Sequence, residues 1–129
     1  MIHGVVTAAR EAVVRITVRG PTGKQRRLNA LIDTGFDGWL SLPAETIDLL
    51  RLPWRRRARA LLADGSETIF DIYEATILWD GRPRRIPIDE ANTSPLVGMV
   101  LLEGYEFNAQ VRVGGAIRLK RLPRASGGD

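Results

Sequence analysis

Residues 28–43 read Leu-Asn-Ala-Leu-Ile-Asp-Thr-Gly-Phe-Asp-Gly-Trp-Leu-Ser-Leu-Pro, which places a polar loop between two extended, apolar segments. The first segment, Leu28 to Ile32, runs directly into Asp33-Thr34-Gly35, and the extended pattern resumes from Trp39 to Leu42. We therefore predict a buried strand that ends at an aspartate, then a tight loop, then a second strand.

Asp33 is the first candidate for chemistry in this stretch. It follows the apolar residues 30–32, so its carboxylate is expected to be partly desolvated at the end of the strand. The Thr34 hydroxyl can hydrogen-bond to a neighbouring backbone group, and Gly35 lets another chain or a substrate approach closely. Taken alone, these three residues favour the alternative, which is an ordinary polar turn after a strand.

Short extended segments separated by turn residues occupy most of the remaining chain. Residues 13–18 alternate with the period of a half-buried strand. Two further extended runs, 59–63 and 67–79, flank Asp64-Gly65, and the second run is followed by Asp80-Gly81. Asp-Gly between extended runs is a strong signal for a two-residue hairpin turn. The side chains of the first strand expected to face the core are Val14, Ile16 and Val18.

Helices are expected at two places only. Pro43 fits the first position of a short helix, and Leu52-Pro53 ends it. A single helical turn is possible from Met99 to Glu103. The apolar face of the first helix would consist of Ile47, Leu49 and Leu50.

The C-terminal third is expected to add strands at 107–113 and 117–122, joined by Gly114-Gly115. Pro83 and Pro87 favour an edge position for the strand that contains them, because proline cannot donate a ladder hydrogen bond. Many short strands with at most two short helices predict an all-β, mostly antiparallel, barrel-like domain.

Composition sets limits on the chemistry. With 129 residues, 44% of them hydrophobic, we predict one domain over residues 1–122 and a flexible tail over 123–129. The chain has no cysteine and one histidine, His3, so thiol chemistry is excluded and neither a histidine zinc site nor a Ser-His-Asp triad is expected. We expect no metal and no cofactor, and chemistry that depends on carboxylates.

Charge and hydropathy say less about partners and location. The net charge of +4 comes almost wholly from arginine, which suits acidic partners in general without identifying one. No run approaches the roughly 20 apolar residues of a membrane-spanning helix, and the N-terminus lacks the layout of a signal peptide. We therefore expect a cytoplasmic protein with no membrane association.

Three motifs together resemble the retropepsin-like aspartic peptidases, and in particular their small bacterial and archaeal single-domain branch. They are the sequence from Ile32 to Pro43, the hairpin Leu62-Ala63-Asp64-Gly65-Ser66, and Pro95-Leu96-Val97-Gly98-Met99. The resemblance covers nearly the whole chain in order and spacing. It implies an acid-protease half-barrel that works as a homodimer, each copy contributing one aspartate to a pair that activates water.

The resemblance also assigns roles to residues. Asp33 matches the catalytic aspartate, with Thr34 and Gly35 shaping the site, and Gly98 belongs to a strand that packs behind the catalytic loop. Substrate contacts would come from Phe36 and Asp37 and from a mobile flap made of Ala63, Asp64, Gly65 and Ser66. The alternative for the flap is a plain surface hairpin, and Asp37 could equally be a solvent-facing acid. Phe36 departs from the small residue of the viral enzymes and agrees with the bacterial branch.

The leading hypothesis is an aspartic endopeptidase acting on a peptide or protein substrate. Its rival is a catalytically silent dimeric module of the same fold that binds a peptide or nucleic acid, and cleavage of its own tail or of one fused partner is a third possibility. The arginine-rich stretch 51–59 could bind phosphates but is more often a solvated face, so nucleic acid is not expected as a partner.

Overall fold

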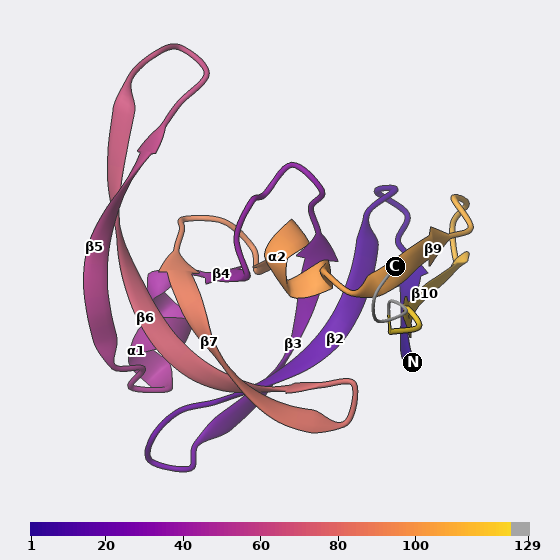
Figure 1. Ribbon diagram of the computed structural model, residues 1–129, viewed down its shortest axis with the longest axis horizontal. Helices are drawn as coiled ribbons and strands as arrows, with labels where there is room; N and C mark the ends of the chain where they lie inside the picture. Colours follow the sequence, from indigo (N-terminus) through magenta and orange to yellow (C-terminus); the bar gives the residue numbers. More distant parts are fainter. Residues whose placement is uncertain (125–129) are drawn as a thin grey trace.

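The computed structural model in Figure 1 describes residues 1–124 as ten strands and two short helices. The strands are β1 (Ile2–Val6), β2 (Ala12–Arg19), β3 (Gln25–Ile32), β4 (Leu40–Leu42), β5 (Trp54–Leu61), β6 (Glu67–Trp79), β7 (Arg82–Glu90), β8 (Leu96–Val97), β9 (Tyr105–Ala109) and β10 (Ala116–Arg121). The helices are α1 (Ala44–Leu49) and α2 (Met99–Leu102), both far too short to cross a membrane.

Six of the strands close into a barrel. Around the ring, β2 pairs with β3, β3 with β8, β8 with β4, β4 with β7, and β7 with β6. The ring closes because the far end of the 13-residue strand β6 also pairs with β2, where Thr17–Arg19 lie opposite Thr76–Leu78. The predicted all-β, barrel-like architecture with two short helices is confirmed.

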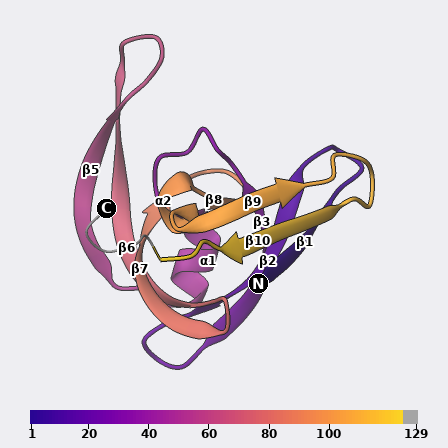
Figure 2. The same ribbon diagram turned by 45° about the vertical axis from the view of Figure 1, so that its right-hand side comes forward.

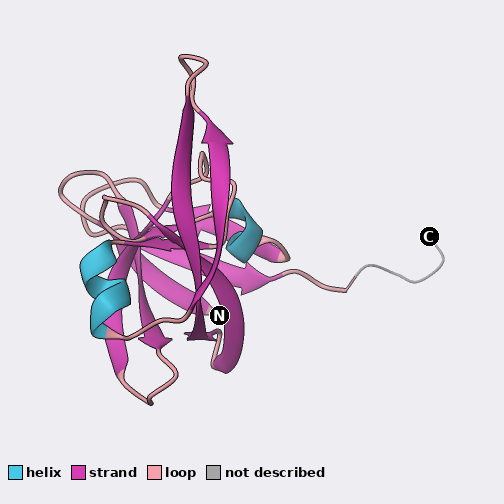
Figure 3. Ribbon diagram, turned by 90° about the vertical axis from the view of Figure 1, so that its left-hand side faces the viewer, coloured by secondary structure: helices cyan, strands magenta, loops and turns pink. Residues whose placement is uncertain are grey.

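Two extensions leave the barrel in different directions. Strands β1, β10 and β9 continue the sheet beyond β2, with β9 at its outer edge (Figure 2). On the other side, β5 and the first part of β6 form a long hairpin that projects from the body (Figures 1 and 3). The core therefore lies inside the barrel, and the hairpin stands outside it.

The period-two pattern of β2 is confirmed by burial. Val14, Ile16 and Val18 are all buried, whereas the residues between them are more exposed. They meet apolar side chains from strands that are distant in the sequence, among them Leu40, Ile77, Ile88, Val97 and Ile117. Burial of this shared face removes apolar surface from water and supplies the main driving force for the fold.

Both predicted helices form, and two details of α1 differ from the prediction, namely its first residue and its apolar face. Pro43 is the N-cap residue of α1, and the first helical residue is Ala44. Ile47 and Leu50 are buried, but Leu49 is 41% exposed, so its place on the apolar face was wrong. Residues three apart share a helix face, whereas Leu49 lies on the other side from Ile47. The turn at α2 forms as predicted.

The observed start of one strand differs from the predicted start because arginines interrupt its apolar pattern. Strand β6 matches its predicted range, but β5 begins at Trp54, five residues before the predicted start. Its arginines do not alternate with apolar residues because β5 pairs with β6 alone and is largely exposed. Strand β1 was not predicted at all.

The prolines of β7 do not place it at an edge, contrary to the prediction. Strand β7 lies between β6 and β4, yet β4 reaches only its last residues, Ile88–Glu90. Pro83 and Pro87 lie in the part of β7 that pairs with β6 alone. No β4 carbonyl lies opposite them, so the absence of their N–H groups costs no hydrogen bond to β4.

The two Asp-Gly turns differ. Asp80 and Gly81 both have positive φ and make the expected two-residue turn between Trp79 and Arg82. At the tip of the long hairpin, the Leu62 N–H donates to the Ser66 carbonyl at 2.7 Å, so the loop is three residues long and the two-residue prediction was wrong. Gly65 supplies the positive φ, 86°, that this loop requires.

The chain beyond residue 122 lies mostly outside the described part. Pro123 and Arg124 have no regular secondary structure, and 125–129, which make up most of the predicted tail, lie outside the described residues.

Candidate active site

Asp33 lies directly after β3 and is held by β8. The two strands run parallel, with Leu31 opposite Leu96 and Ile32 opposite Val97. The Asp33 N–H continues this pairing by donating to the Val97 carbonyl at 2.9 Å. The backbone of Asp33 is therefore fixed from outside its own loop.

The loop that follows, residues 33–39, is tied to the start of α2. The N–H groups of Gly98, Met99 and Val100 donate to the carbonyls of Trp39, Phe36 and Gly38 at 3.0, 2.9 and 3.0 Å. Three consecutive backbone N–H groups thus hold residues 33–39, which we call the Asp33 loop.

Gly98 is required for this grip. A Cβ on Gly98 would overlap the Gly38 carbonyl oxygen and would lie 2.7 Å from Cδ2 of the Phe36 ring. No side chain fits between two backbones that are this close. The structural role that the sequence resemblance implied for Gly98 agrees with this packing.

The Asp33 carboxylate is also oriented locally. Its Oδ1 accepts a hydrogen bond from the Gly35 N–H at 2.9 Å. The second carboxylate oxygen makes no hydrogen bond within residues 1–124, and the Thr34 hydroxyl is likewise without a partner there. The loop therefore presents one oxygen and one hydroxyl that are free to act on another molecule.

A pocket of about 580 Å³ opens beside Asp33. Asp33, Gly35 and Phe36 line one side, and the inner part of the β5–β6 hairpin, including Ile69 and Phe70, lines another. We call it the Asp33 pocket. Of the predicted site residues, the structure brings Asp33, Gly35 and Phe36 together here.

The other predicted residues lie elsewhere. Thr34 and Asp37 are exposed on the Asp33 loop and do not line the pocket. Residues 63–66 form the exposed tip of the hairpin, beyond the pocket walls (Figure 3). In this arrangement the middle of the hairpin, rather than its tip, covers the pocket.

Ser41, Asp89 and Glu90 line the pocket and were not singled out from the sequence. Ser41 of β4 lies opposite both Asp89 of β7 and Leu96 of β8. The side chains of Ser41, Asp89 and Leu96 therefore share one face of the sheet. Burial raises the pKa of Asp89, and the nearby Arg56 guanidinium only partly opposes that rise. A polar residue inside the apolar run Leu40-Ser41-Leu42 was the available signal.

Polar contacts stiffen the base of the hairpin. Asp71 accepts hydrogen bonds from the Trp54 indole N–H at 3.1 Å and from Arg57 at 3.2 Å, and the indole contributes most to lowering the pKa of this carboxyl. Arg55 and Glu74 form an ion pair at 2.9 Å. The base is thus cross-linked between β5 and β6.

Within residues 1–124, the side-chain hydrogen bonds of the hairpin tip lie inside its own turn. The Asp64 carboxylate accepts hydrogen bonds from the hydroxyl and the N–H of Ser66, and the hydroxyl contributes most to lowering the pKa of Asp64. The tip residues are exposed, and nearby Leu61, Leu62 and Ile69 expose apolar side chains. An exposed tip on a cross-linked base has few contacts to lose when it moves.

The sequence matches no family model and no curated protein. Solved structures that are similar to this chain include two aspartic proteases. EIAV protease complexed with an inhibitor has 18% identity and a TM-score of 0.52 over 74% of this chain and 88% of that chain. A retropepsin-like aspartic protease from Rickettsia conorii has 13% identity and a TM-score of 0.56 over 95% of this chain and 91% of that chain. The chain has the retropepsin-like fold. The fold implied by the sequence motifs is therefore confirmed.

The grip on the Asp33 loop predicts the effect of Gly98→Ala. Because its Cβ would meet backbone that cannot move aside, we expect the free energy of unfolding to fall by about 3 kcal/mol. The control is Gly104→Ala, where φ is +88° but no atom lies within 4 Å, so only a left-handed strain of roughly 1 kcal/mol is expected. Urea denaturation measures both, and equal losses would contradict a special role for Gly98.

Proposed function

We propose that this protein is a cytoplasmic, homodimeric aspartic endopeptidase whose catalytic group is Asp33. The observation that carries the proposal is the placement of Asp33 at the edge of a pocket that the projecting hairpin also lines. Its backbone N–H donates to β8, and its carboxylate accepts a hydrogen bond from the Gly35 N–H. The fold is one whose solved relatives include aspartic proteases.

The proposed chemistry needs a second carboxylate. Two carboxylates a few ångströms apart cannot both stay ionised, so one keeps a proton and the other deprotonates water, as in the aspartic-protease dyad. The protonated acid polarises the peptide carbonyl while the activated water attacks it. Each chain supplies a single Asp33, so the partner in this mechanism is a second copy across a two-fold axis.

The surface offers material for such an interface. Strand β9 lies at the outer edge of the sheet, where its backbone has no further strand to pair with in the described chain (Figure 2). Several large apolar side chains are exposed on or near the elements that flank it. They are Met99, Phe107, Val111, Val113 and Leu122.

A flap role is proposed for the β5–β6 hairpin. Closure of its tip over a bound peptide would bring residues 63–66 toward the substrate and would exclude water from the reaction. Phe36 would line the bound peptide from the opposite side, and Asp37 stays a candidate for contact with the peptide backbone.

The rival function, a silent module that binds peptide or nucleic acid, has less support. The arginines of β5 are largely matched by acids on β6, since Arg55 pairs with Glu74 and Arg57 with Asp71. Arginines whose charge is balanced by a neighbouring carboxylate attract phosphate groups only weakly. A module that only binds also has no need for two facing carboxylates, which cost stability.

We expect sedimentation equilibrium to give a dimer. The proposed mechanism places Asp33 opposite itself on a two-fold axis, so the active species contains two chains. A protein that stays monomeric at high concentration and in crystals would lack the second carboxylate, and the mechanism would fail.

Asp33→Asn should reduce cleavage of a mixed peptide library by roughly 10⁴-fold, the scale of losing one essential group. The dimer should be as stable as the parent near neutral pH or more so, because asparagine keeps the shape and removes a like charge. Asp48→Asn, an exposed change on α1, is the control. An active Asp33→Asn protein would overturn the assignment.

Gly65→Val should slow turnover by roughly ten- to a hundredfold, the scale of misplaced substrate-positioning groups, while the melting temperature changes little. A β-branched residue resists the φ of +86° at this exposed tip. Gly23→Val is the matched control, since Gly23 has a φ of +87°, also has no atom within 4 Å, and lies in the β2–β3 turn. Equal turnover in the two variants would show that the hairpin is not the lid.

A further inference from the structure

The Asp33 pocket is acidic in a basic protein. Four carboxylate residues line it, namely Asp33, Asp71, Asp89 and Glu90, and no lysine, arginine or histidine is among the described lining residues. The chain as a whole carries a formal charge of +4. The sign of the pocket is therefore a local property that opposes the overall charge.

Asp89 is a pocket carboxylate that lacks a partner, and its neighbour Glu90 also forms no ion pair within residues 1–124. Asp71 is already engaged by Trp54 and Arg57, and Asp33 is engaged by the Gly35 N–H. Asp89 is half-buried and makes neither an ion pair nor a hydrogen bond within residues 1–124. A partly desolvated carboxylate without a partner is costly unless a cation or donor reaches it.

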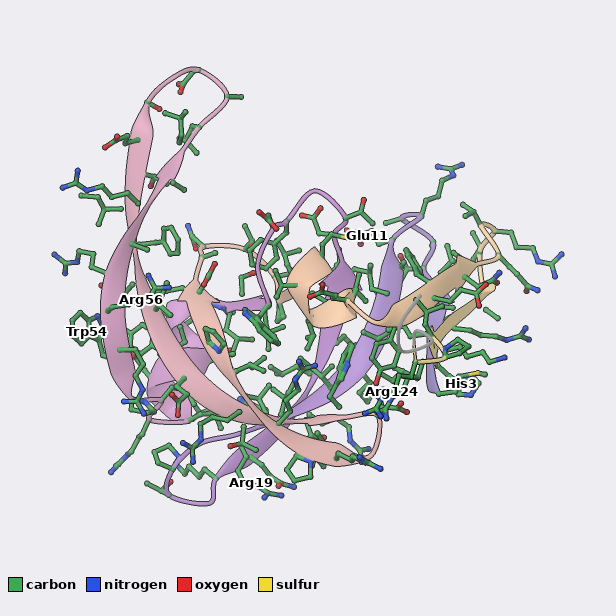
Figure 4. The ribbon with its side chains drawn as sticks, in the orientation of Figure 1. His3, Glu11, Arg19, Trp54, Arg56 and Arg124 are labelled. Atoms are coloured by element: carbon green, nitrogen blue, oxygen red, sulfur yellow. The ribbon has the colours of Figure 1, made fainter. Side chains whose placement is uncertain are left out.

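Arg56, the basic residue that acts electrostatically on Asp89, is not among the residues that line the pocket. Arg56 is separated from Asp89 by one strand, because Arg56 pairs with Ile72 and Ile72 pairs with Asp89. It attracts Asp89 electrostatically but does not form an ion pair with it. Figure 4 shows Arg56 on β5, a strand outside the barrel ring. The space next to Asp89 is therefore open to a different cation.

Ser41 gives a second, independent indication. It is 2% exposed, lines the pocket beside Asp89, and its Oγ has no hydrogen-bond partner in the described chain. A hydroxyl offers both a donor and acceptor lone pairs. A bound N–H group that reached Asp89 would find this second acceptor next to it.

We propose that the Asp33 pocket receives a lysine or arginine side chain of the substrate and that Asp89 determines this specificity. The methylene stem would pack against Phe36, Ile69 and Leu96, and the charged head would reach Asp89 and Ser41. This inference rests on the proposed peptidase function, since Asp33 borders the same pocket. It adds the class of substrate, which is a peptide with a basic residue near the cleaved bond.

The preference has a defined pH dependence. Only ionised Asp89 attracts a cation, and burial raises its pKa above that of an ordinary aspartate, with Arg56 opposing. The preference for a basic residue should therefore be weak in acid and should grow as pH rises through the pKa of Asp89. The other charged groups facing it are Asp33, Asp71 and Glu90 in the pocket and Arg56 across β6.

The test compares peptides that differ at one position only, carrying lysine, methionine or glutamate in turn at each site around the cleaved bond. For wild type we expect kcat/KM for the best lysine peptide to exceed that for its methionine match by roughly tenfold or more, the scale of one charge-assisted hydrogen bond. Asp89→Asn should remove this difference, and Asp48→Asn should leave it unchanged. Since asparagine retains the shape and removes a buried charge, the variant is expected to fold.

A binding measurement separates the two proposals. Asp33→Asn protein should bind the lysine peptide more tightly than the methionine peptide by isothermal titration, and the double variant Asp33→Asn, Asp89→Asn should not.

Cleavage without a preference for lysine would overturn the role of Asp89 and leave the peptidase standing. Binding that depends on Asp89, with no cleavage by wild type, would overturn the peptidase and support the pocket. The pH profile of the preference in wild type tests the inference without any substitution, and a flat profile would contradict it.

Discussion

The close contact between Gly98 and the Asp33 loop is the constraint on which the rest of the site depends. Three consecutive backbone N–H groups at residues 98–100 bind three carbonyls of the loop, and no side chain would fit between the two segments. These bonds fix the backbone at Phe36, Gly38 and Trp39, while the bond to the Val97 carbonyl in β8 fixes Asp33 itself. Because these contacts are between backbone groups, the position of the carboxylate depends little on flexible side chains, which is what a preorganised catalytic group requires.

The hairpin over the pocket has the opposite character. Its base is cross-linked by the ion pairs of Arg55 and Arg57, whereas its tip is exposed and held by the contacts within one turn. The barrel therefore combines a rigid floor with a cover that has few contacts to lose when it moves. This division of stability is what the proposed peptidase needs, since a substrate must enter before water is excluded.

Carboxylates around one pocket have different surroundings. Asp71 is neutralised by Trp54 and Arg57 and serves the hairpin. Asp33 is oriented by a backbone N–H and lines the pocket, and Asp89 is half-buried beside the Ser41 hydroxyl, which has no hydrogen-bond partner in the described chain. Residue type alone would not separate these three acids. The proposals for Asp33 in chemistry and Asp89 in recognition rest on their distances to donors and their burial.

The sequence by itself determined the strand class, the hairpin at Asp64-Gly65 and the strand-loop-strand around Asp33, because local alternation and turn residues act over a few neighbours. It missed the start of β5, where arginines on an exposed strand carry no alternation. Only the tertiary structure placed Ser41 beside Asp89, since these residues are far apart in the chain and meet through the pairing of β4 with β7. Barrel closure decides which strands become neighbours, and no local pattern encodes it. The residues proposed to recognise the substrate were therefore decided by the fold, and the residue proposed to cleave it was already visible in the sequence.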